Sequence, residues 1–249
     1  MFDPFKDFAQ AGYLRNLYGE KDLQIVQEIE HQLFRAGLDE AIAHLAGRRA
    51  LGYPDFLQVH RILFAALYPW AGRDRAATAP DIAVTKAGTW FCHPLDARLA
   101  VEEGLRIASD PRQLRQRPGE VMGLFAYGHP FLDGNGRTML VVHSELCYRA
   151  GFCVEWHRAS KADYLAALSS EIAAPGRGIL DGYLAPFIGA RQERHLWGSV
   201  IGRLAGLDGQ GAQDAIEGEY LDAEVSRKYQ EFEQRRGYQP DRLGDGGEV

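Results

Sequence analysis

The segment 129–137 constrains the fold of this 249-residue chain more than any other stretch. It reads His-Pro-Phe-Leu-Asp-Gly-Asn-Gly-Arg, so that Gly134 and Gly136 bracket Asn135. Because glycine adopts positive φ at little steric cost, successive N–H groups here can point into one concavity that holds an anion. Residues 138–148 follow with an apolar helical pattern. The concavity is therefore predicted at a helix N-terminus, where the helix dipole favours phosphate.

The charged side chains of this segment fit the same interpretation. Arg137 carries a planar fork that suits phosphate oxygens. Asp133 offers the hard oxygen ligand through which Mg²⁺ binds beside nucleotide phosphates. His129 is the one group here that accepts a proton near neutral pH. Together these residues predict a phosphate-binding site with a metal ion and a general base.

Each fragment of the segment also has a simpler interpretation. A Gly-Asn-Gly sequence is usually only a turn, and a histidine before proline is usually a loop or core residue. His129 and Asp133 are also conceivable as two zinc ligands. No cysteine and no third histidine stands beside them at metal-ligand spacing, so zinc is the less favoured metal.

Taken whole, the segment resembles the signature of the Fic family, His-Pro-Phe-x-Asp/Glu-Gly-Asn-Gly-Arg-x-x-Arg, and matches it through the first arginine. The resemblance implies a mostly α-helical bundle with a small β-hairpin flap over the active site. It also implies transfer of a nucleoside monophosphate, most often AMP from ATP, to a protein hydroxyl group, with Mg²⁺ as the cofactor.

The resemblance also assigns roles to individual residues. His129 is expected to be the general base that takes the hydroxyl proton, and Asp133 the Mg²⁺ ligand. Phe131 is expected to anchor the loop. The expected phosphate-binding residues are Gly134, Asn135 and Gly136, as an anion hole, and Arg137, as a clamp on the leaving pyrophosphate. The chain departs from the family at Leu140, where the second arginine usually grips the terminal phosphate.

A second resemblance to the family lies far upstream. His60-Arg61-x-x-Phe64 runs into Trp70-Ala-Gly-x-x-Arg75, and two separated matches are unlikely to be coincidence. On physical grounds this part is expected to be scaffold. Trp70 is predicted to be a large buried side chain, and His60 a hydrogen-bonded core histidine rather than a catalyst.

Residues 82–93 favour β-structure within an otherwise helical pattern. β-Branched and aromatic residues flank a turn at 86–88. The resemblance identifies this lone hairpin with the flap, whose free edge would align a target segment by strand addition. Lys86, Gly88 and Thr89 are then expected at the nucleotide. The alternative is an ordinary surface hairpin.

Apolar periodicity predicts the remaining secondary structure. Predicted helices cover residues 23–34, 38–45, 55–67, 95–107, 119–128, 138–150 and 160–172, and the segment 182–201 closes the domain. Gly47 and Gly151 are expected to end two of these helices. Tyr164 stands where family members often place an aromatic ring against the adenine, although a core role is equally compatible.

Composition and periodicity divide the chain into five parts. Residues 1–12 form an N-terminal arm, 13–201 the Fic-like domain, 202–214 a glycine-rich linker, 215–237 a C-terminal helix and 238–249 a disordered tail. The C-terminal helix is expected to cap the domain or to bind an antitoxin or other regulatory partner. Glu217 lies in a weak match to the inhibitory motif of the family, without its hydroxyl residue.

Charge and cysteine content narrow the function further. A net charge of −6 and a pI near 5.8 argue against a nucleic-acid-binding protein. Three cysteines form no metal spacing, and reduced thiols are the simplest interpretation. The chain has no apolar signal core and no stretch that would span a membrane. A cytoplasmic location is therefore expected, and delivery by a specialised secretion system would leave no readable mark.

These observations favour a Mg²⁺-dependent protein adenylyltransferase that moves AMP from ATP to a Ser, Thr or Tyr hydroxyl of a target protein. One alternative is a related transferase that uses UTP, a phosphocholine diphosphate donor or a transferred phosphate. The other is a catalytically weak nucleotide-binding interaction module, because Leu140 breaks the signature.

Overall fold

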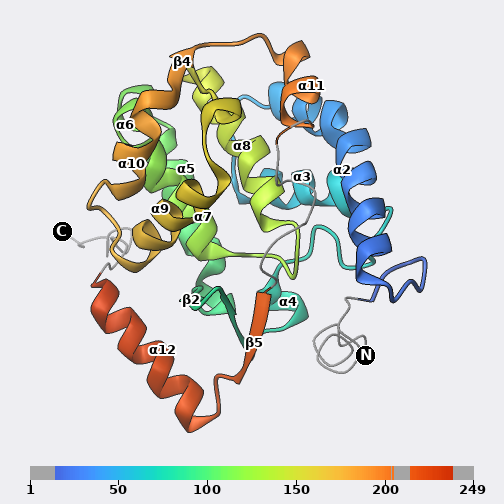
Figure 1. Ribbon diagram of the computed structural model, residues 1–249, viewed down its shortest axis with the longest axis vertical. Helices are drawn as coiled ribbons and strands as arrows, with labels where there is room; N and C mark the ends of the chain where they lie inside the picture. Colours follow the sequence, from blue (N-terminus) through green and yellow to red (C-terminus); the bar gives the residue numbers. More distant parts are fainter. Residues whose placement is uncertain (1–14, 203, 205–213, 238–249) are drawn as a thin grey trace, which may run out of the picture.

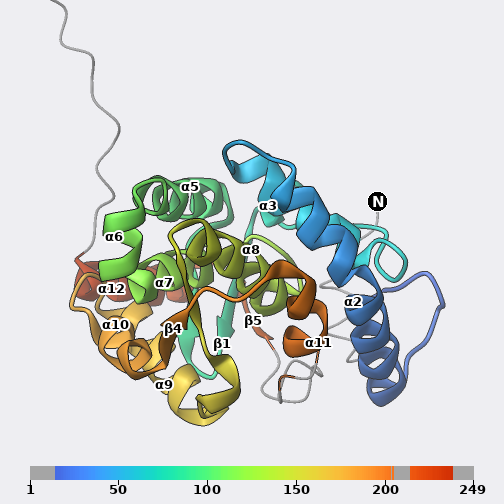
Figure 2. The ribbon, with the colours of Figure 1, turned by 90° about the horizontal axis from the view of Figure 1, so that it is seen from above.

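The computed structural model describes residues 15–202, 204 and 214–237 as a helical bundle with two small sheets (Figure 1). The predicted arm, most of the linker and the predicted tail lie outside these residues. The central helices are α7 (Pro118–Gly128) and α8 (Asn135–Arg149). Figure 2 shows α2 (Leu23–Ala46) and α3 (Tyr53–Phe64) together on one side of this pair.

The remaining helices are short apart from three. The longer ones are α5 (Ala97–Ala108), α9 (Lys161–Ala173) and α12 (Ala223–Arg236). The short ones are α4 (Arg75–Thr78), α6 (Pro111–Gln116), α10 (Ile179–Leu184) and α11 (Trp197–Ile201), with 3₁₀ turns at Pro94–Asp96, Trp156–Arg158, Ala185–Phe187 and Arg194–Leu196.

Local sequence signals account for the ends of several helices. The Asp22 side chain accepts a hydrogen bond from the Gln24 N–H and so caps α2, which runs without a break through both predicted segments and ends at Gly47. The Ser160 side chain caps α9 in the same way. The predicted helices around Asp55 and over 119–128 are likewise confirmed.

Helix α7 is buried on all sides, which holds its C-terminal end in a fixed place. Its side chains belong to the main hydrophobic core, and α5 packs along it. A Cβ on Gly104 of α5 would lie 2.7 Å from the Phe125 ring, so only glycine allows this close approach. The segment that follows α7 therefore begins from a rigid support.

The two sheets join segments that are far apart in the sequence. Strands β1 (Ile82–Lys86) and β2 (Thr89–Trp90) form the predicted hairpin, and β5 (Asp214–Glu219) adds to the other edge of β1. Strands β3 (Phe152–Val154) and β4 (Ile188–Ala190) pair separately. All pairs are antiparallel.

Two predictions about this region were wrong. The hairpin is not alone with a free edge, because β5 pairs with β1 from Ile82↔Glu219 to Lys86↔Asp214. The C-terminal helix also does not begin at residue 215. Residues 214–219 lie in a strand instead and alternate in exposure as a strand does, because β1 supplies backbone partners that periodicity cannot detect.

No helix in the described part of the chain is long and apolar enough to cross a membrane.

Candidate active site

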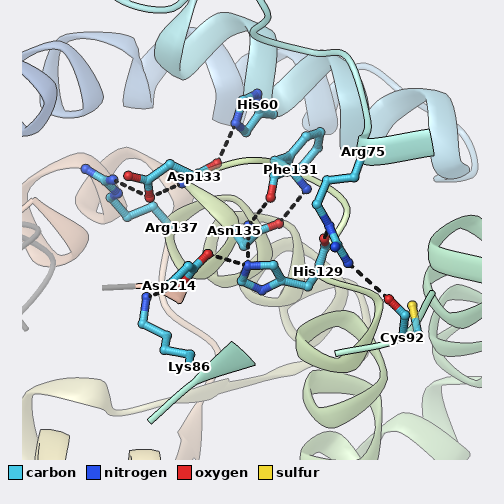
Figure 3. Close-up of polar contacts among 11 residues, drawn as sticks. His60, Arg75, Lys86, Cys92, His129, Phe131, Asp133, Asn135, Arg137 and Asp214 are labelled. Atoms are coloured by element: carbon cyan, nitrogen blue, oxygen red, sulfur yellow. Dashed lines mark hydrogen bonds and ion pairs between the residues drawn. The ribbon is translucent and has the colours of Figure 1, made fainter. Parts of the chain in front are cut away.

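The segment 129–137 forms a tight loop between α7 and α8 (Figure 3). His129 ends α7 in the left-handed region, with φ 39° and ψ 55°. Gly134 has φ 76° directly before α8, and a Cβ there would lie 2.5 Å from the Phe64 ring. Both the conformation and the space therefore require glycine at 134.

The side chain of Asn135 ties this loop together. Its Oδ1 accepts from the Phe131 N–H at 2.8 Å, and its Nδ2 donates to the Phe131 carbonyl at 2.7 Å. Nδ2 also lies 3.1 Å from His129 Nε2. Sequence analysis expected Asn135 in the anion hole, and its side chain instead braces the loop and the histidine. Its backbone begins α8, so its N–H still lies in the first helical turn.

Gly136 is exposed at that first turn. A Cβ at Gly136 would meet no atom within 4 Å, so the space in front of the turn is open. The unpaired N–H groups of a helix start and the dipole of this long helix both favour an anion at that place. The phosphate site expected from the sequence stays a prediction, and this open helix start is compatible with it.

Arg137 lies under the loop, where Glu30 of α2 binds it. Arg137 Nη2 is 2.6 Å from Glu30 Oε1 and 3.8 Å from Asp133 Oδ1, and its guanidinium lies over the Phe64 ring. Arg137 Nη1 is buried and finds no hydrogen-bond partner among the described residues. One buried nitrogen of the guanidinium is thus without an acceptor among the described residues.

Burial acts in opposite directions on the pKa values of Glu30 and Arg137. It raises the pKa of Glu30 to about 7, and nearby Asp133 adds to this rise although Arg137 opposes it. The pKa of Arg137 lies above its usual range, because the attraction of Glu30 and Asp133 exceeds the effect of burial. Glu30 was not predicted. The signal was present, because Val26, Glu30 and Phe34 are spaced by four residues on the buried face of α2.

Asp133 is the residue that fits a magnesium ion. Its side chain is 43% exposed at the mouth of the loop, and its Oδ1 accepts from the Gly134 N–H at 2.6 Å. Among the described residues, no three His, Cys, Asp or Glu side chains gather as a metal cluster. One carboxylate beside a phosphate site is the donor set by which Mg²⁺ binds together with a nucleotide.

Two buried side chains from the upstream signature, His60 and Arg75, bind the backbone of the loop. His60 Nδ1 accepts from the Gly72 N–H at 2.9 Å, so its Nε2 carries the proton and donates to the Asp133 carbonyl at 2.9 Å. Burial lowers the pKa of His60 to about 3, which keeps it neutral. The prediction of a hydrogen-bonded core histidine is confirmed.

Arg75 supports the loop on its other side. It is completely buried, and its Nε donates to the His129 carbonyl at 2.8 Å while its Nη2 donates to the Cys92 carbonyl at 3.1 Å. The Arg75 N–H donates to the Pro130 carbonyl. The left-handed backbone of His129 is therefore held by charge-assisted hydrogen bonds.

The imidazole of His129 lies between the flap and the C-terminal segment. Its ring stacks on Phe91 with centroids 3.7 Å apart. Its Nε2 is 2.7 Å from Asp214 Oδ2, and Lys86 Nζ is 3.0 Å from Asp214 Oδ1. Burial lowers the pKa of His129, although Asp214 acts against this. Despite its burial, the pKa of Asp214 lies well below its usual range, because His129 and Lys86 attract the carboxylate.

Of the other predicted site residues, two lie on the flap and one lies on α9. Gly88 is exposed at the hairpin turn, and Thr89 begins β2. Tyr164 lies on α9 and its ring contacts Trp156 and Tyr183. Leu140 is only 6% exposed in the core, so the position at which the resemblance would place a second arginine is part of the packing here.

Asp214 is the site residue that sequence analysis missed. It stands in a segment that composition marked as the end of a linker, and no motif connects it with His129. Only the pairing of β5 with β1 brings the two residues together.

Comparisons with known proteins agree with the resemblance of the sequence to the Fic family. The model of the Fic/DOC family matches residues 50–147. Over 175 residues, the chain is 27% identical to protein adenylyltransferase VbhT of Bartonella schoenbuchensis; the match covers 66% of this chain and 35% of that protein. A probable protein adenylyltransferase of Sinorhizobium fredii, y4lH, is 27% identical over 164 residues, which cover 62% of this chain and 81% of that protein.

Among solved structures, the fold is similar to that of the BepC protein of Bartonella tribocorum, a VirB-translocated effector protein with bound AMPPNP. The TM-score is 0.58 at 17% sequence identity, with 72% of this chain and 93% of that chain covered. This likeness establishes a shared, mostly helical fold that includes the hairpin.

Proposed function

Residues 50–147 belong to the Fic/DOC family, and from this premise we propose that the protein transfers AMP from ATP to a Ser, Thr or Tyr hydroxyl of a target protein. The names of the two distant relatives support a transferase of this type. The match spans only about a third of VbhT, so the activity of that whole protein is not carried over. The AMPPNP bound to BepC supports a nucleotide as the donor.

The observation that carries the proposal is the position of His129 Nε2 beside the open first turn of α8. Asn135 bridges the two, because its side chain lies 3.1 Å from Nε2 and its backbone starts the helix. A phosphate held by the N–H groups of that turn would therefore lie near the base. Nucleotide transfer needs a general base next to an anion site.

The proposed reaction forms one oxygen–phosphorus bond and breaks another. The hydroxyl oxygen of the target attacks the α-phosphorus, its proton passes to His129 Nε2, and pyrophosphate leaves with the bonding electron pair. The N–H groups of residues 135–137, in the first turn of α8, and the unpartnered Nη1 of Arg137 would stabilise the charge on the phosphates. Asp133 would hold Mg²⁺, which supplies further charge neutralisation at the phosphates when it is bound.

A nucleotide-binding interaction module is the second candidate. The observations that favour it are the pairing of Arg137 with Glu30 and the burial of Leu140, since both reduce the cations that can face a triphosphate. Such a module would bind nucleotide without transferring any part of it.

Labelled donors separate these candidates. The protein is incubated with bacterial lysate and either α-labelled ATP, γ-labelled ATP, α-labelled UTP or labelled CDP-choline, and incorporation into protein is measured. We expect label only from α-labelled ATP and none with the His129→Ala variant. Label from γ-labelled ATP would indicate a kinase, and label from UTP or CDP-choline would identify another donor. Nucleotide binding in calorimetry without incorporation from any donor would favour the module.

A further inference from the structure

The C-terminal strand β5 occupies the edge of the flap that would otherwise be open. It pairs antiparallel with β1, with Thr85 opposite Ala215 and Lys86 opposite Asp214. The Tyr220 N–H continues the pairing by donating to the Asp81 carbonyl at 2.8 Å. A segment of another protein could add to β1 only after this strand leaves.

The first residue of β5 places a carboxylate on the proposed base. Asp214 Oδ2 is 2.7 Å from His129 Nε2, and Lys86 holds the other oxygen of the same carboxylate. An ionised carboxylate has no proton to donate. The hydrogen of this contact therefore belongs to His129, and Nε2 is held in its proton-donating form. A base that must take a proton from a hydroxyl needs the lone pair at that nitrogen.

Side-chain contacts further along β5 fix its register. Glu217 Oε1 accepts from Thr85 Oγ1 at 2.6 Å. The pairing shifts between Ala83 and Val84, and this irregularity leaves Glu217 without an opposite residue. Gly218 beside it has φ 129°, which favours glycine. The strand is therefore seated in one register by both backbone and side chains.

Helix α12 holds β5 in place from outside. Tyr229 accepts at its hydroxyl from the His93 N–H at 2.9 Å, and Glu233 accepts from the Tyr127 hydroxyl at 2.7 Å. Arg236 lies over the Tyr127 ring and donates from Nε to the Ile172 carbonyl at 3.0 Å. Figure 1 shows β5 and α12 together along one edge of the bundle. The segment is thus a built element with its own anchor.

We propose that residues 214–219 are a built-in pseudosubstrate, in which the Asp214 carboxylate stands where the hydroxyl of a target side chain would meet His129. This inference rests on the proposed function, and it adds the register in which an extended target segment would pair with β1. The target would be an extended segment whose hydroxyl residue lies opposite Lys86, with an acidic residue three positions later against Thr85. A seated β5 blocks the modification of other proteins, so the wild type modifies a target only in the fraction of molecules from which β5 has left.

Replacing the carboxylate by a hydroxyl tests the proposal directly. In Asp214→Ser, we expect one added AMP per molecule at residue 214 on incubation with ATP, at a rate that does not depend on protein concentration. Peptide mapping by mass spectrometry locates the label. Glu219→Ser is the matched control, because it places a hydroxyl on the same strand away from His129 and should remain unlabelled there. The double variant with His129→Ala should carry no label.

A second variant tests the blocking role. Asp214→Ala removes the carboxylate and leaves His129 free, so label incorporation into lysate proteins from α-labelled ATP should rise by about 10²-fold or more over the wild type. The ¹⁵N shift of His129 Nε2 provides a readout that does not depend on activity. It should indicate a protonated nitrogen in the wild type at pH 7 and should change in Asp214→Ala.

The outcomes separate this inference from the proposed function. Label in lysate proteins without label at residue 214 in Asp214→Ser would overturn the pseudosubstrate and leave the transferase intact. An equal rate for the wild type and Asp214→Ala, or an unchanged ¹⁵N shift, would overturn the blocking contact. Failure of every variant to incorporate label from any donor would overturn the proposed function, and the inference with it.

Discussion

The loop 129–137 and the C-terminal segment 214–236 meet at His129, but they are held in different ways. The loop is braced from behind by Arg75 and His60, two fully buried side chains that bind its backbone carbonyls. The C-terminal segment is attached by a strand edge and by one face of α12, and Lys86, which binds the first residue of the strand, is 43% exposed. A catalytic loop must keep one geometry, whereas a segment that yields to a target needs contacts that can be broken one by one.

The largest effect is expected from His129→Ala. If the loop supplies the base, transfer of AMP should fall by about 10²–10⁴-fold, because proton removal from the hydroxyl is lost. The fall in transfer is measured as label incorporation by proteins that also carry Asp214→Ala, because the base is not blocked in that variant. Circular dichroism checks that the fold is kept. Near-normal transfer by this variant would show that the base lies elsewhere.

The next prediction sharpens the claim that the loop is rigid. Arg75→Met should lower the free energy of unfolding by roughly 2–5 kcal/mol, because the His129 and Cys92 carbonyls lose their buried donors. Denaturant unfolding measures the change. Arg73→Met is the control on an exposed neighbour and should stay within about 0.5 kcal/mol of the wild type. Equal stability of the two variants would remove Arg75 from the support of the loop.

A pH dependence tests the contact between Arg137 and Glu30. The pKa of Glu30 rises to about 7 in the folded state from 4.5, so between these values the folded protein retains a proton that the unfolded chain releases. This contribution to stability is present below pH 4.5 and is lost as the pH rises through 7. Relative to Glu30→Gln, the wild type should therefore lose on the order of 3 kcal/mol across that range. Parallel stability curves for the two proteins would contradict the raised pKa.

The smallest effect is expected in the C-terminal segment. Tyr229→Phe removes the hydroxyl that accepts from the His93 N–H and should cost about 1 kcal/mol. Hydrogen exchange of the β5 amides should become faster by roughly fivefold, while the amides of α7 and α8 keep their protection. Faster exchange in the central helices as well would mean that the two regions open together and that the C-terminal segment is not held separately.

Most of the helical architecture was predictable because its signals are local. Asp22 and Ser160 cap their helices through their own backbone neighbours, and apolar periodicity marked α3 and α7. The strands of the flap were found because their turn and side-chain types are also local signals. The strand β5 was missed for the opposite reason, since its partner β1 lies far away in the sequence.

The same distinction between local signals and contacts of distant segments applies to the candidate site. The sequence by itself determined the residues of the loop, because glycines, a histidine and an aspartate in one short stretch specify a chemistry without reference to the rest of the chain. Only the tertiary structure decided that Glu30 binds Arg137 and that Asp214 meets His129. Both are contacts between distant segments, and they form only when the whole chain packs and excludes water from charged groups that sequence alone would leave exposed.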